Sequence, residues 1–88
     1  MRSIEMASPC LGPSSGGTWC YGWYAREVGP GVINKYCYSN YAHETKGHSS
    51  TVKLAGNARR VHAAADDVSN ANLTAGLAYT CSTYYSVD

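Results

Sequence analysis

The sequence has no phenylalanine and few aliphatic side chains, so a hydrophobic core must be small or built from other residues. Leucine, isoleucine and valine together make up only 12 of its 88 residues. In a highly charged chain that content would indicate disorder, but the formal net charge here is only +1. Eight tyrosines and two tryptophans supply large rings that can be buried instead. We therefore expect one small folded domain.

The chain also lacks a long apolar run and an excess of either charge. No stretch approaches the roughly 20 apolar residues that cross a bilayer as a helix, so we do not expect a transmembrane protein. The balanced charge argues against nucleic acid as a partner, because no long-range field draws phosphates toward the protein. The first ten residues, MRSIEMASPC, lack the apolar core of a signal peptide, so we expect the mature form of a secreted protein.

The four cysteines indicate an oxidising compartment. None lies in a CxxC pair, which disfavours a zinc knuckle. An even number of cysteines in so short a chain is typical of two disulfides, which stabilise a small core. This pattern predicts a secreted protein.

The cysteine pairing follows from a hairpin that the early sequence predicts. Residues 18–24 and residues 33–41 have the composition of strands, and the loop between them is broken by Gly29-Pro30-Gly31. In that hairpin Cys20 lies directly opposite Cys37, close enough for a disulfide. The second predicted disulfide then joins the remaining cysteines, Cys10 and Cys81.

A second hairpin is predicted over residues 36–56. Its strands, 36–41 and 49–54, flank a polar turn at Glu44–Gly47. This register sets three pairs opposite each other: His43 and His48, Tyr41 and Ser50, and Tyr38 and Lys53.

The rest of the chain predicts two more strands. Gly56-Asn57 has the composition of a two-residue turn of the II′ kind, which leads into a strand over 58–64, although 58–65 could instead form a short helix. Residues 66–75 are predicted to form a polar loop and residues 76–87 a last strand. The fourth strand then sets Val52 opposite Val61 and Lys53 opposite Arg60.

Alternation along these strands predicts two faces. One is the expected core: Cys20, Tyr24, Ile33, Cys37, Tyr41, Val52, Leu54, Val61 and Ala63. The other is aromatic with cations among the rings, and includes His62. Such a surface is either covered by a second sheet or binds a ligand. Its candidate binding residues are Trp19, Tyr21, Trp23, Tyr36, Tyr38, Lys53 and Arg60. Lys53 facing Arg60 indicates an anionic or sugar-bearing ligand, a partner carboxylate, or two long side chains that splay apart into water.

Catalytic and metal chemistry have little support in the sequence. His43, His48 and Glu44 could ligate zinc, but we interpret the two histidines as turn residues that bond to backbone and hydroxyl groups. The even cysteine count argues against a free nucleophilic thiol, and no GxSxG motif supports a serine nucleophile. We therefore expect neither an enzyme nor a cofactor.

Several motifs resemble the lactococcin 972 family of secreted bacterial proteins. They are Gly16-Gly17-Thr18-Trp19, Tyr21-Gly22, Tyr38-Ser39-Asn40-Tyr41, His43 and His48-Ser49-Ser50-Thr51-Val52. The resemblance implies an all-β fold, a small antiparallel β-sandwich of two sheets. It also implies antibacterial activity without catalysis, through interference with cell-wall synthesis by way of a lipid-linked precursor.

The four cysteines and a long N-terminal tail distinguish this sequence from the founding member of that family. We assign residues 1–15 to an extended tail and residues 16–88 to the sandwich domain. Similar domains also serve as the small adaptor subunit of umbrella-shaped toxin particles, joining a lectin-like subunit to a larger spoke protein. The partners are thus either other secreted toxin subunits or a cell-envelope component. The tail residues that would dock on a partner are Ile4, Met6 and Leu11.

Overall fold

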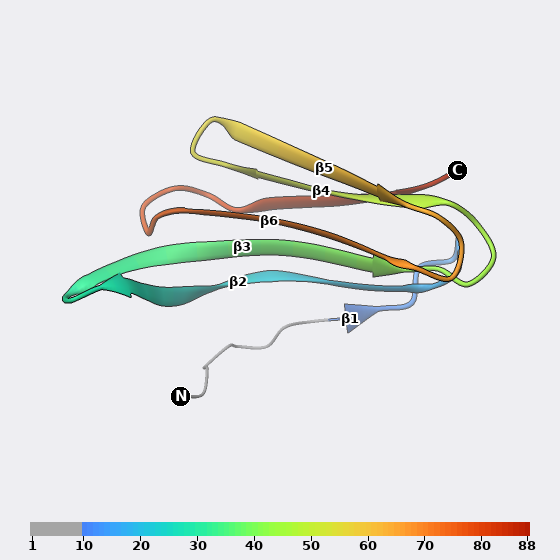
Figure 1. Cartoon of the computed structure of the whole chain (residues 1–88), viewed down its shortest axis with the longest axis horizontal. Coiled ribbons are helices and arrows are strands. Elements are labelled where there is room, and N and C mark those ends of the chain that lie inside the picture. The colour runs from blue at the N-terminus through green and yellow to red at the C-terminus, as the bar shows by residue number, and fades with distance from the viewer. Residues whose placement is uncertain (1–9) are drawn as a thin grey trace.

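The computed structural model describes residues 10–88, and it confirms the predicted all-β sandwich with two disulfides. Two antiparallel sheets pack against each other (Figure 1). Sheet A has the strand order β1-β2-β3-β6 and sheet B the order β5-β4-β7. The strands are β1 (Cys10–Leu11), β2 (Thr18–Gly29), β3 (Val32–Ala42), β4 (His48–Leu54), β5 (Asn57–Ala63), β6 (Val68–Gly76) and β7 (Ser82–Val87).

The hairpin of β2 and β3 is longer than the sequence predicts. Residues 25–32 were expected to form a loop, but β2 continues to Gly29 and β3 begins at Val32. The turn needs only Pro30 and Gly31, because Gly31 adopts a positive φ of 73°. A β-bulge interrupts the register between Glu27 and Gly29. The tip of this hairpin projects beyond the other strands along the long axis of the molecule (Figure 1).

The longer hairpin changes the predicted register. Cys20 pairs with Asn40, and Cys37 pairs with Trp23. This is a shift of three residues, and an odd shift moves every side chain of β2 to the other face of the sheet. Cys20 and Cys37 therefore lie on opposite faces of sheet A and cannot bond.

The predicted cysteine pairing is accordingly wrong. Cys10 bonds to Cys20 across β1 and β2, and Cys37 bonds to Cys81. The second bond ties β3 of sheet A to the residue directly before β7 of sheet B, and its sulfur atoms lie in the interior. The Cys10–Cys20 disulfide thus fastens the edge strand β1 to β2, while the Cys37–Cys81 disulfide joins the two sheets.

The predicted hairpin over residues 36–56 is also wrong, because β3 and β4 belong to different sheets. Residues 43–47 cross from one sheet to the other, so none of the three pairs predicted for that hairpin forms. Tyr41 instead pairs with Trp19 on one side and Ser69 on the other. Both edges of β3 are occupied, by β2 and β6, which leaves no edge for β4.

Strand β6 occupies much of the segment that was predicted as a polar loop. Its inward residues are small: Ser69 and Ala71 are fully buried. They alternate with the exposed Asn70 and Asn72. Buried and exposed residues do alternate along β6, but the buried ones are small or polar, so the sequence does not show the apolar alternation that is typical of a strand. The predicted last strand, 76–87, is consequently shorter and begins at Ser82.

The hairpin of β4 and β5 confirms a strand, rather than a helix, after residue 56. Its turn is Ala55-Gly56, with positive φ at both residues (55° and 80°), as a type I′ turn requires. The turn predicted at Gly56-Asn57 is displaced by one residue. The pairing shifts by two, so Val52 lies opposite Arg59 and Lys53 opposite Ala58. Since two is even, the faces of both strands remain as predicted.

The interior combines a small apolar cluster with buried hydroxyl groups. The cluster consists of Cys37, Val52, Leu54 and Ala71. Beside it, Ser39 Oγ of sheet A donates to the Tyr84 carbonyl of sheet B at 3.0 Å, and Ser50 Oγ donates to the Ser69 carbonyl at 2.9 Å. Hydrogen bonds between the sheets therefore supplement a thin core. Of the expected core, Ile33 is exposed, and Cys20 and Tyr24 lie on the outer face of sheet A.

Candidate functional site

The structure separates the predicted binding residues into three groups. Trp19, Tyr21 and Trp23 share the inward face of sheet A with Cys37, while Tyr36 and Tyr38 lie on its outer face. The two cations, Lys53 and Arg60, lie on the outer face of sheet B. The prediction that all seven share one face is wrong for two reasons: the odd shift in register between β2 and β3, and the placement of β4 and β5 in the other sheet. Their role in binding stays a prediction.

The inward aromatic group is largely part of the fold. The Trp19 ring lies 4.1 Å from the Tyr21 ring and 4.6 Å from the Tyr85 ring of β7, between centroids. The Trp19 Nε1 donates to Ser39 Oγ at 2.9 Å. Trp23 differs, because 47% of its surface is exposed and the Lys35 Nζ lies 4.3 Å from its ring.

The outer face of sheet A carries three tyrosines. Tyr36 lies 5.0 Å from Tyr24 and 6.2 Å from Tyr38, between ring centroids, and the Arg26 guanidinium lies 5.1 Å above its ring. Burial raises the pKa of Tyr36, as do Tyr24 and Tyr38, while Arg26 lowers it. The net rise keeps this phenol protonated and able to donate. Sequence reasoning missed Tyr24 and Arg26, because the wrong register put Tyr24 in the core.

The outer face of sheet B holds the most accessible polar groups. Arg60 lies opposite Thr51, not opposite Lys53 as predicted, so the two cations are diagonal neighbours. Arg60 Nη2 contacts Ser49 Oγ at 3.4 Å and Ser86 Oγ at 3.5 Å. The Lys53 Nζ lies 5.5 Å above the Tyr84 ring. Sequence reasoning missed Tyr84 and Ser86, because it did not place the last strand beside β4.

Both cations on this face are available to an anion. Within residues 10–88 the single ion pair joins His62 Nε2 to Asp88 Oδ2 at 2.9 Å, so neither Lys53 nor Arg60 has a carboxylate partner there. Arginine and lysine with neighbouring hydroxyls form a suitable set of donors for a phosphate or carboxylate. We define Lys53, Arg60 and Tyr84 as the cationic face.

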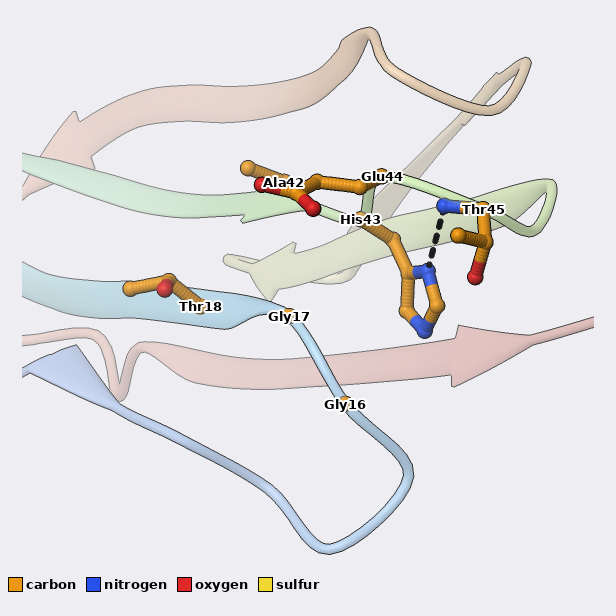
Figure 2. A pocket seen from close by; sticks show the side chains of 7 residues that line it. All are labelled: Gly16, Gly17, Thr18, Ala42, His43, Glu44 and Thr45. Carbon is orange, nitrogen blue, oxygen red and sulfur yellow. Dashed lines mark hydrogen bonds between the residues drawn. The ribbon is translucent and has the colours of Figure 1, made fainter.

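A pocket of about 460 Å³ opens at one end of the sandwich (Figure 2). It is lined by Gly16, Gly17, Thr18, Ala42, His43, Glu44 and Thr45. Gly16 and Gly17 adopt positive φ angles of 97° and 83°, and a Cβ on Gly17 would collide with the Ala42 carbonyl. The glycine pair therefore allows β2 to begin close against the end of β3.

The two histidines near this pocket bond to the backbone, as predicted. His43 Nδ1 accepts from the Thr45 and Lys46 amides, and its Nε2 donates to the Ser15 carbonyl at 3.0 Å (Figure 2 shows the Thr45 bond). His48 is fully buried, with Nδ1 and Nε2 each 2.8 Å from the carbonyls of Lys46 and Asp67. All four ring nitrogens thus contact the backbone, and within residues 10–88 no cluster suited to a metal occurs.

Only part of the predicted tail falls within the described residues. Leu11 lies in β1 opposite Trp19 and is about half exposed. Ile4 and Met6 lie outside the described residues. β1 itself belongs to the segment assigned to the tail, where Cys10 anchors it to β2. β1 therefore forms the edge of sheet A beside β2.

Comparison with known proteins complements this geometry. A family model described as "Bacteriocin (Lactococcin_972)" matches residues 15–85. No curated protein and no solved structure matches the chain. Among residues 10–88 there is no helix with the length and apolar character to cross a bilayer. The matched residues include β2 to β6 and the first four residues of β7, together with the cationic face and the pocket.

Proposed function

Since this chain belongs to the lactococcin 972 family of bacteriocins, we propose that it acts by binding a lipid-linked cell-wall precursor of target bacteria. Membership in the family makes it a secreted antibacterial protein, and the disulfides agree with an extracellular location. The proposal requires recognition alone and no catalytic step.

The cationic face carries this proposal. A lipid-linked precursor presents phosphates next to sugars. Lys53 and Arg60 lie diagonally on exposed strands, without a carboxylate partner in the described residues, and can contact the phosphates. The exposed Tyr84 ring beside Lys53 offers a flat surface on which a sugar can pack. The exposed hydroxyl of Ser86 adds a polar partner, while the buried Ser49 hydroxyl contacts Arg60 from below.

Replacing both cations should weaken this binding. In the variant K53Q/R60Q we expect the affinity for precursor-bearing vesicles to fall by at least about tenfold, because two charged contacts to phosphate are lost. Co-sedimentation with vesicles that do and do not contain the precursor measures the effect. Antibacterial activity should fall in parallel.

A variant with the same loss of charge provides the control. K46Q/R59Q removes one lysine and one arginine that are exposed but lie off this face, in the loop before β4 and on the other side of β5. It should bind as the wild type does. Equal losses in both variants would show a nonspecific charge effect, and unchanged activity of K53Q/R60Q would exclude the cationic face from the mechanism.

A second candidate function is that of an adaptor within a larger secreted toxin particle, joining a lectin-like subunit to a spoke protein. The Cys10–Cys20 bond favours it, because this bond holds the start of β1 at the edge of sheet A. A segment fixed at one end loses less entropy when it docks on a partner. Isolated apolar residues such as Ile4 and Met6 suit insertion along a groove.

Deletion of residues 1–8 tests the adaptor function. We expect the truncated protein to keep its melting temperature, because both disulfides and all the described strands remain, and to lose co-purification with its partner subunits from the producing strain. If the deletion lowers the melting temperature while partners still co-purify, the segment stabilises its own domain and the adaptor function loses its support.

A further inference from the structure

Exposed apolar side chains gather at one end of the molecule. Val28, Val32 and Ile33 surround the turn of the projecting β2–β3 hairpin, and they are 49%, 50% and 44% exposed. Gly76 pairs with Asn34, so the loop after β6 lies beside this turn. That loop adds the exposed residues Leu77 and Tyr79. We call these five residues the apolar tip. Figure 1 shows the hairpin extending past the rest of the sandwich, so the tip is convex.

The cations nearest the apolar tip lie away from the hairpin turn. Lys35 pairs with Ala25 and is only 8% exposed. Its Nζ lies over the ring of Trp23, which is two residues farther from the turn, and donates to the Tyr79 carbonyl. Arg26 pairs with Asn34, and its guanidinium lies over the ring of Tyr36, which is also farther from the turn. The turn of the hairpin is therefore free of positive charge.

Along the hairpin the residue types are therefore ordered. Aliphatic residues occupy the end, and cations and aromatic rings, including Trp23 and Tyr36, follow behind them. This order is typical of segments that enter the surface of a bilayer, where apolar groups reach the acyl region while aromatic rings and extended cations remain among the headgroups. A protein partner would instead need a groove that fits this convex end.

One carboxylate limits how deeply such a hairpin can enter. Glu27 lies opposite Ile33, and its Oε2 accepts the Gly31 amide at 3.4 Å. A carboxylate is costly in the acyl region, so the contact must stay at headgroup depth. The Val28 side chain belongs to the bulged residue, which lies outside the regular pairing and is free to turn toward lipid.

From these observations we propose that the apolar tip is a membrane-contact surface, and that it inserts shallowly into the outer face of a lipid bilayer. The proposed surface lies on the hairpin of sheet A, while the cationic face lies on sheet B. The tip thus binds lipid itself, whether or not a precursor is present. For a protein that binds a lipid-linked precursor, as proposed above, this contact would hold the protein at the bilayer surface where the precursor is anchored.

Vesicles of phosphatidylcholine without precursor test the proposal, because they carry no net charge. We expect the wild type to co-sediment with them and its tryptophan fluorescence to shift to shorter wavelength as Trp23 enters the interface. The variant V32T/I33T keeps β-branched side chains, so it should stay folded. Its partitioning should fall roughly tenfold, since two half-exposed aliphatic side chains lose their contact with lipid.

The control is V68T, which also replaces a half-exposed aliphatic residue, near the other end of the sandwich. It should partition as the wild type does. The proposal is overturned if the wild type does not bind these vesicles, or if both variants lose binding equally. It is also overturned if V32T/I33T loses only a protein partner. If K53Q/R60Q binds these vesicles as the wild type does, the apolar tip contacts lipid independently of the two cations.

Discussion

Removal of the Cys37–Cys81 disulfide should lower the free energy of unfolding by about 4 kcal/mol. This bond spans a sequence separation of 44 residues, and the entropy that a crosslink removes from the unfolded chain increases with the length of its loop. The apolar cluster around it is small, and a domain of this size has only about 5–15 kcal/mol in total. The double variant C37A/C81A is therefore expected to unfold at a much lower urea concentration.

The other disulfide provides the comparison. Cys10–Cys20 spans only 10 residues, so C10A/C20A should lose about 3 kcal/mol by the same relation. Urea denaturation of both variants measures the difference. Peptide mapping of the single variant C10A should find Cys20 as the free thiol. A free Cys81 in that variant, or a larger loss in C10A/C20A, would contradict the pairing.

The second large effect is expected at His48. Its two ring nitrogens contact the carbonyls of Lys46 and Asp67, which lie in loops at the same end of the two sheets. These contacts tie the loop before β4 to the loop before β6. H48A would remove both contacts and create a cavity beside Tyr41. We expect a loss of about 3–5 kcal/mol.

His62 is the natural control for this substitution. Its Nε2 also contacts an oxygen, Oδ2 of the Asp88 carboxylate, but both side chains are 55% exposed. H62A should change stability by less than about 1 kcal/mol. Thermal unfolding of both variants makes the comparison. Similar losses in H48A and H62A would contradict the structural role of His48.

The sequence was most informative where side chains are large. The aromatic alternation in residues 18–24 and 36–41 predicted strands, and strands are there. The even cysteine count predicted two disulfides, and motifs between residues 16 and 56 predicted the family. Each of these signals is local, because it depends on neighbours in the chain or on a count.

Pairing was less predictable, because it depends on residues far apart. The Pro30-Gly31 turn is only two residues long, and a loop of eight was assumed; that difference moved Cys20 to the other face. Strand β6 was missed, since its buried side chains are as small as Ser69 and Ala71. Without β6, β3 had a free edge, and β4 was assigned to it.

The candidate site depended on the same pairings. Lys53 and Arg60 share a face as predicted, because the error in their register was even. The rings expected beside them are on sheet A, and the ring that is beside them, Tyr84, comes from β7. No local pattern indicates that a strand near the C-terminus will lie next to β4.

The late position of β6 in the chain has a consequence for the order of folding. Its partner β3 is complete by Ala42, but the pairing joins Asn34 to Gly76 and must wait until most of the chain is available. Meanwhile the β2–β3 hairpin has an unpaired edge, and Trp19 does not yet have the Tyr85 ring of β7 against it. Pairings between such distant segments form slowly, on the order of milliseconds to seconds. During that interval the early hairpin is the part of the chain most exposed to self-association. A reducing medium, which leaves Cys37 and Cys81 unbonded, should therefore lower the yield of folded protein on refolding as well as its equilibrium stability.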